Sequence, residues 1–234
     1  MASLFSKLKN PFPSARHSAM PPIGLYSQDA LALVKRHLAW LNTPTSQWSP
    51  KRTQALSAYK AWIQQHQVVN DLLRVPSAMS MCHLIRILDD LVFDSTILHY
   101  FQFGWRELNN GRSGQTIALY SVRMALIEMD PTLLGQGRLL NSVVSTLLHE
   151  MCHAYLFLFS CQGVFCGRRS CLEGSRRYNK EIGRTGHGAA WEQLAWAVED
   201  FGNGLKVLRV DLTVAYAVSF EDEKLKAQEQ AVGL

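Results

Sequence analysis

Apolar side chains recur every three or four positions over the first third of the chain, which is the period of amphipathic helices. Breaks at Pro44 and Pro76 divide this region into three predicted helices. The first follows Ser27, a residue type that caps helix N-termini, and the second begins near Pro50, because proline suits the first helical position. The predicted helices cover about 28–41, 50–74 and 78–93.

The period then changes to the alternation that is typical of β-strands. Residues 101–105 read Phe-Gln-Phe-Gly-Trp, and residues 109–114 are dense in asparagine and glycine, as turns are. Two short segments rich in β-branched and large apolar residues follow at 116–120 and 124–129. We therefore predict an α+β fold with a small, mostly antiparallel sheet of about three strands.

The longest apolar run covers 143–159 and lies in a predicted helix that starts near residue 139. It approaches the length of a membrane span, but His149, Glu150 and His153 at its centre would be costly in a bilayer, and no companion span is visible. We therefore expect a buried helix of a soluble domain and no membrane association.

The remaining chain alternates between irregular and helical patterns. A glycine-rich insert covers 161–186, and a helix is predicted from Ala189 until Gly202 stops it. Residues 205–210 are a strand candidate, and 213–230 form a loosely amphipathic helix.

His149, Glu150 and His153 form a His-Glu-x-x-His pattern on the long helix. Residues four apart lie on one face of a helix, so the two imidazoles can point at one metal ion. Two neutral imidazoles suit zinc, and Glu150 suits a base for the metal-bound water. The alternative is a buried helix whose polar residues serve packing or capping.

A catalytic zinc site needs three protein ligands, and His187 is the strongest candidate for the third. It stands at a predicted helix start between Gly186 and Gly188, which would let the backbone approach another element closely. The alternative is a histidine in a flexible turn with no metal role.

The segment Leu147-Leu148-His149-Glu150-Met151-Cys152-His153-Ala154, together with Thr185-Gly186-His187-Gly188 and Trp191, resembles the SprT-like metalloprotease domain of Spartan-like DNA-dependent proteases. The likeness extends over about 78–204. It implies zinc held by His149, His153 and His187, Glu150 as catalytic acid and base, and a compact minigluzincin-like fold of a few strands packed on the motif helices. It also implies a nuclear protein that degrades proteins crosslinked to DNA.

Composition is that of a globular protein and leaves the partners open. Hydrophobic residues make up 47% and charged residues 18%, and the net charge of +5 is compatible with a polyanionic partner without identifying one. Five cysteines and no visible secretory signal predict reduced thiols inside the cell. The cytoplasm and the mitochondrion are alternatives to the nucleus, the latter because no acidic residue precedes Asp29.

The insert at 161–186 departs from the family pattern and is basic. Its arginines are candidates for contacts with DNA phosphates, the alternative being a solvated loop: Arg168, Arg169, Arg176 and Arg177. Its three cysteines, spaced by five, are candidates for a second, structural zinc: Cys161, Cys166 and Cys171. Because paired Cys-x-x-Cys is missing, free or packed thiols are the alternative.

These patterns predict a domain order and a function. The order is a disordered tail (1–26), an N-terminal helical extension (27–76), a SprT-like metalloprotease domain (77–204) and a C-terminal extension (205–234). The function is that of a zinc-dependent endopeptidase, DNA-dependent and acting on DNA–protein crosslinks, in which Glu150 activates a zinc-bound water. A DNA- or chromatin-binding module with a structural zinc is one alternative, although such a site has no need of Glu150. A metallopeptidase unrelated to DNA is another, and the oligomeric state stays open.

Overall fold

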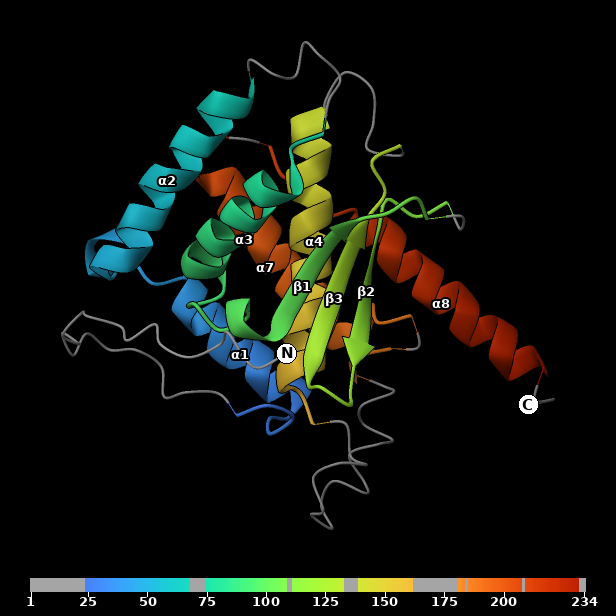
Figure 1. The fold of residues 1–234 in the computed structure, drawn as a ribbon. Coiled ribbons are helices and arrows are strands. Elements are labelled where there is room, and N and C mark those ends of the chain that lie inside the picture. Colours follow the sequence, from blue (N-terminus) through green and yellow to red (C-terminus); the bar gives the residue numbers. More distant parts are fainter. Residues whose placement is uncertain are drawn as a thin grey trace, which may run out of the picture.

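The computed structural model describes residues 24–67, 75–108, 111–132, 139–161, 181–183, 185–207 and 209–231. Over these residues it contains six α-helices and a three-stranded sheet, which confirms the predicted α+β class. One long helix, α4 (Leu139–Phe159), lies against the sheet, and several of the other helices also pack against it (Figure 1). The metal motif therefore lies on the element that the rest of the fold covers.

Three helices precede the sheet, close to their predicted spans. They are α1 (Ala30–Leu41), α2 (Pro50–Gln67) and α3 (Ala78–Val92), with a 3-10 turn η1 (Thr45–Gln47) between the first two. The predicted cap of the first helix was wrong. Asp29 caps α1 by accepting a hydrogen bond from the Ala32 N–H at 2.9 Å, whereas the Ser27 hydroxyl donates to the Gly24 carbonyl.

Arg52 ties these helices to each other and to the rest of the protein. It is only 3% exposed, and its guanidinium donates to the carbonyls of Leu91 at 3.1 Å, Trp40 at 3.1 Å and Leu41 at 3.2 Å. The same group stacks over the Trp40 ring and lies 5.0 Å from the ring centre of Phe201 in the C-terminal half. The N-terminal helices thus share one core with the predicted metalloprotease domain, and the boundary at 76 stays a prediction.

The sheet has the order β1-β3-β2. Its strands are β1 (Phe101–Trp105), which follows the 3-10 turn η3 (Leu98–Tyr100), β2 (Gly114–Leu119) and β3 (Met124–Met129). The hairpin β2–β3 is antiparallel, as expected, but β1 pairs with β3 in parallel, so the sheet is mixed. The reason is that β2 runs back in the opposite direction to β1 but does not pair with it. The chain then turns again, and β3 pairs between β1 and β2, parallel to the first and antiparallel to the second.

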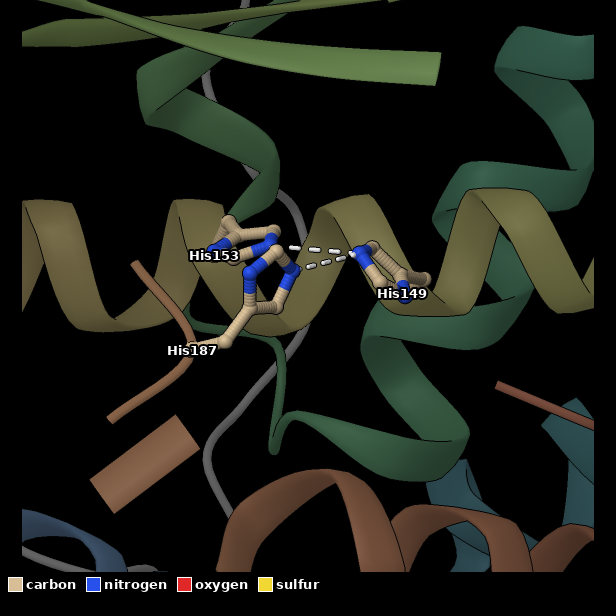
Figure 2. Close-up of side chains that lie close together, drawn as sticks. All are labelled: His149, His153 and His187. Atoms are coloured by element: carbon tan, nitrogen blue, oxygen red, sulfur yellow. Dashed lines mark hydrogen bonds between the residues drawn. The ribbon is translucent and has the colours of Figure 1, made fainter. Parts of the chain in front are cut away.

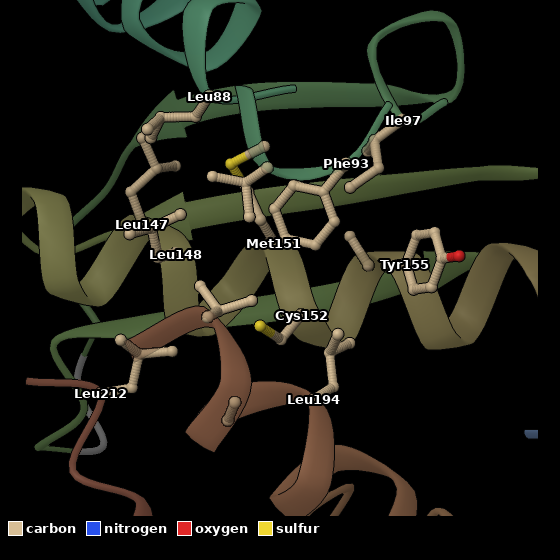
Figure 3. Close-up of a cluster of buried hydrophobic side chains, with 14 of the residues drawn as sticks. Leu88, Phe93, Ile97, Leu147, Leu148, Met151, Cys152, Tyr155, Leu194 and Leu212 are labelled. Atoms are coloured by element: carbon tan, nitrogen blue, oxygen red, sulfur yellow. The ribbon is translucent and has the colours of Figure 1, made fainter. Parts of the chain in front are cut away.

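Apolar residues of α4 form the centre of the core. Leu147, Leu148, Met151, Cys152 and Tyr155 are buried there. Figure 3 shows them between side chains of α3, its following loop and α7 (Ala189–Gly204). By length and composition α4 could cross a membrane, but 78% of its apolar window is buried inside the fold, as in the core helix of a globular domain.

The chain after α7 does not form the predicted strand. Among the described residues of 205–213 the backbone is irregular, and the Asn203 side chain bonds both the N–H and the carbonyl of Val210. The last helix, α8 (Val214–Ala231), begins one residue later than predicted and packs against α7.

Candidate metal centre

Three imidazoles converge on one point beside α4. The Nε2 atoms of His149, His153 and His187 lie 3.3, 3.1 and 3.2 Å from one another (Figure 2). Tetrahedral zinc with bonds of about 2.0–2.1 Å separates its nitrogen ligands by about 3.3 Å. The donor type and the spacing of this cluster therefore both fit a zinc ion.

Local structure explains why these residues meet. Helix α4 places His149 and His153 one turn apart, and a turn before α7 brings His187 to them. That turn needs glycine at 186, where φ is +91° and an added Cβ would lie 3.0 Å from Nδ1 of His153. The close approach expected from the flanking glycines is thus present.

All three histidines are held in the neutral form that a metal requires. Burial lowers the pKa of His149 and lowers that of His153 well below the ordinary value. Burial also lowers the pKa of His187 to about 4, and the charge of the nearby Glu221 carboxylate opposes this shift. At neutral pH each ring therefore offers an uncharged nitrogen.

Trp191 packs against all three ligand rings. Its ring centre lies 4.7 Å from that of His149, 5.2 Å from that of His153 and 4.5 Å from that of His187. The indole is fully buried. It restricts the rotation of the imidazoles and keeps bulk water from one side of the cluster.

Glu150 is buried beside the ligands and is fixed by the sheet. Its Oε2 accepts a hydrogen bond of 2.7 Å from the Thr116 hydroxyl on β2. An added Cβ at Gly114 would lie 3.0 Å from Oε1 of Glu150, so the start of β2 also lies against the carboxyl group. Burial raises the pKa of Glu150 to about 7, opposed by the Thr116 hydrogen bond and the charge of Arg112. Such a group can both accept and release a proton near neutral pH.

The insert residues named from the sequence lie mostly outside the described residues. These are Arg168, Arg169, Arg176, Arg177, Cys166 and Cys171. Cys161 is described as a half-buried free thiol, and the three histidines form the one metal-binding cluster found among the described residues. The second zinc and the DNA contacts of the insert therefore stay predictions.

Several polar groups around the cluster were not predicted. Leu212, Thr185 and Glu221 bond the ligand histidines or their neighbours, and Thr116 bonds Glu150. Thr185 stands next to the His187 turn in the sequence, which is a weak signal. Glu221 and Leu212 lie far along the chain in no recognisable motif, so only the tertiary structure reveals them.

A buried helix with His-Glu-x-x-His, a third histidine from a distant turn and a buried carboxyl group define the site of a zinc-type metallopeptidase. Residues 81–166 match the SprT-like family, so this segment, a little over a third of the chain, is a SprT-like family domain. The match includes His149, Glu150 and His153 but ends before His187. Searches of characterised proteins and of solved structures give no match.

Proposed function

We propose that the chain is a zinc-dependent endopeptidase that cleaves proteins bound or crosslinked to DNA. The observation that carries the peptidase part is the triangle of Nε2 atoms, 3.1–3.3 Å apart, beside the buried carboxyl group of Glu150. A purely structural zinc site would need no such carboxyl group.

The chemistry follows from the groups around the triangle. Zinc held by His149, His153 and His187 would acidify a water molecule and polarise the peptide carbonyl. Glu150 would accept a proton from the attacking water as the water oxygen bonds to the carbonyl carbon. The same carboxyl group then gives the proton to the amide nitrogen as the C–N bond breaks, so Glu150 returns to its starting state. The Thr116 hydroxyl holds Oε2 and keeps the carboxyl group from rotating during both transfers.

The substrate is proposed to lie along β2 as an added strand. Strand β2 is at the edge of the sheet among the described residues, and Thr116 on it contacts Glu150. Main-chain hydrogen bonds to such an edge bind many sequences, which suits an enzyme with varied protein substrates. Peptides with N-methylated backbone amides near the cleaved bond should be cleaved more slowly than unmodified ones. A strict side-chain requirement around that bond would count against this arrangement.

The DNA-dependent part of the proposal rests on charge and resemblance. The chain has a net charge of +5, and its motifs resemble those of Spartan-like proteases. We propose DNA as partner, DNA-bound proteins as substrates and the nucleus as location. Charge reversal at the four insert arginines should weaken DNA binding and flatten its salt dependence. An unchanged affinity would exclude the insert as a DNA contact. The positions are Arg168, Arg169, Arg176 and Arg177.

One experiment tests the whole proposal. Zinc content and cleavage of a DNA-binding protein are measured without DNA, with single-stranded DNA and with double-stranded DNA. We expect one zinc per chain and DNA-stimulated cleavage. Glu150→Gln should keep the zinc and lose activity by about 10²–10⁴-fold, whereas Glu107→Gln, at an exposed position, should match the wild type. Equal cleavage with and without DNA would indicate a metallopeptidase unrelated to DNA. Zinc and DNA binding without cleavage would indicate a structural module.

A further inference from the structure

The chain beyond α7 bonds one ligand histidine directly and reaches a second through Thr185, in both cases at the Nδ1 atom of the ring. The carbonyl of Leu212 accepts a hydrogen bond of 2.9 Å from Nδ1 of His149. The carboxyl group of Glu221, on α8, reaches His187 through Thr185. We propose that Glu221 and Thr185 are positioning residues that orient His187 for the metal, so that α8 is part of the metal site. This inference rests on the zinc site of the proposed function.

The hydrogen bonds fix the proton on His187. Oε2 of Glu221 accepts from the backbone N–H of Thr185 at 2.8 Å and also from its hydroxyl. Because the hydroxyl proton points at the carboxylate, Thr185 Oγ1 offers a lone pair to Nδ1 of His187, 2.8 Å away. Nδ1 must therefore carry the ring proton, and Nε2 presents its lone pair to the point between the three ligand nitrogens. A carboxylate behind a ligand histidine also raises the basicity of the ring.

We call the hydrogen-bonded chain from Glu221 through Thr185 to His187 the relay, and packing holds it in place. Glu221 is 3% exposed, and burying a carboxylate is costly unless hydrogen bonds compensate it. An added Cβ at Gly183 would lie 2.8 Å from Cδ of Glu221, so the backbone preceding His187 lies directly on the carboxyl group. With φ of +83° at Gly183, this approach is open to glycine and strained for other residues. The loop that carries His187 is thus shaped around Glu221.

Hydrogen bonds also fix the position of the Leu212 carbonyl. Its own N–H donates to Glu199 on α7 at 2.7 Å, and the Thr213 hydroxyl donates to the Leu212 carbonyl at 2.7 Å. Thr213 has φ of +55°, which is rare for a β-branched residue and marks a constrained backbone. Since a carbonyl only accepts, Nδ1 of His149 must carry the proton, and His149 also presents Nε2. The segment from Leu212 to Glu221 therefore sets the orientation of two ligands.

Zinc affinity of the full chain tests the relay. Competition with a chromophoric chelator is measured for the wild type, Glu221→Gln, Thr185→Val and Thr185→Ser. We expect zinc binding to weaken by roughly 10–100-fold in Glu221→Gln and Thr185→Val. Thr185→Ser keeps the hydroxyl and should bind within about twofold of the wild type. Glu223→Gln, an exposed glutamate on the same helix, is the matched control and should leave the affinity unchanged.

The proton position provides a readout that a packing role would not change. Nitrogen-15 NMR of the metal-free wild type should show His187 protonated at Nδ1, and Thr185→Val should shift this ring towards a mixture of tautomers. Protonation at Nε2 in the wild type would overturn the inference, as would folded Glu221→Gln and Thr185→Val variants with wild-type zinc affinity. A wild type that binds no zinc would instead refute the proposed function, while the NMR result would still decide the relay.

Discussion

Replacing Arg52 by methionine should destabilise the whole protein, including the metal site. Methionine keeps an apolar stem of similar length and removes every donor. Two of the three carbonyls bonded by Arg52, those of Leu41 and Leu91, would then be buried without this donor, whereas Trp40 O also accepts the Thr43 N–H. Each unsatisfied buried acceptor costs about 1–3 kcal/mol, so the free energy of unfolding should fall by about 2–6 kcal/mol.

Burial lowers the pKa of Arg52 to about 10, which leaves it charged at neutral pH, so its hydrogen bonds are of the stronger, charge-assisted kind. Urea unfolding followed by circular dichroism should therefore show a lower midpoint at an unchanged slope. The melting temperature should fall by roughly 4–24 °C, at about 2–4 °C per kcal/mol for a chain of this size. The stability of Arg52→Lys should lie between those of the wild type and Arg52→Met, because one ammonium group cannot make all the hydrogen bonds of the guanidinium group.

Arg86→Met is the matched control, since Arg86 lies exposed on α3 and should change stability by no more than about 0.5 kcal/mol. An Arg52→Met protein as stable as this control would refute the stabilising role of the Arg52 hydrogen bonds. A transition in two steps, with zinc binding retained after the first, would show that the N-terminal helices unfold separately. We expect one step, because α1 packs directly on α7 and α4.

Three further results are expected. Zinc at about 100 times its dissociation constant should stabilise the protein by about 2.7 kcal/mol. A melting temperature that changes neither with added zinc nor with a chelator would contradict the metal site. Gly186→Ala should weaken zinc binding roughly tenfold or more, because a side chain there is strained and meets His153; Gly204→Ala, where a methyl group meets nothing within 4 Å, is the control. Burial raises the pKa of Asp89 from 3.8 to about 7, so between these pH values the native state keeps a proton that the unfolded state loses. The free energy of unfolding should therefore fall as the pH rises from about 4 to 7. Urea midpoints at pH 5 and 7.5 should differ less for Asp89→Asn than for the wild type, and equal differences would show that Asp89 is not responsible.

Local sequence patterns predicted the elements of the fold because each depends on short-range chemistry. The bounds of β1, β3 and α4 agree with the predicted segments, since alternation and helical periodicity act within a few residues. The parallel pairing of β1 with β3 was missed, because strand order depends on which edge the returning chain reaches. The cap at Asp29 in place of Ser27 shows the same limit at small scale, since both residue types can cap and only the path of the chain decides.

Some residues of the metal site could likewise be predicted from local sequence patterns, and others could not. His149 and His153 could be paired from the sequence because a helix fixes their geometry, and His187 because a catalytic zinc requires a third ligand. The groups that fix their protons are single residues on a later segment, where a carbonyl and one buried glutamate resemble many others. Those groups, Leu212 and Glu221, lie past the predicted domain boundary at 204 and past the end of the family match at 166. A boundary at 204 would separate His149 from the carbonyl that holds its proton on Nδ1, and Thr185 from the carboxyl group that orients its hydroxyl. The metal affinity of the three-histidine site is therefore set in part by the segment from Leu212 to Glu221, which neither the motif nor the family match includes.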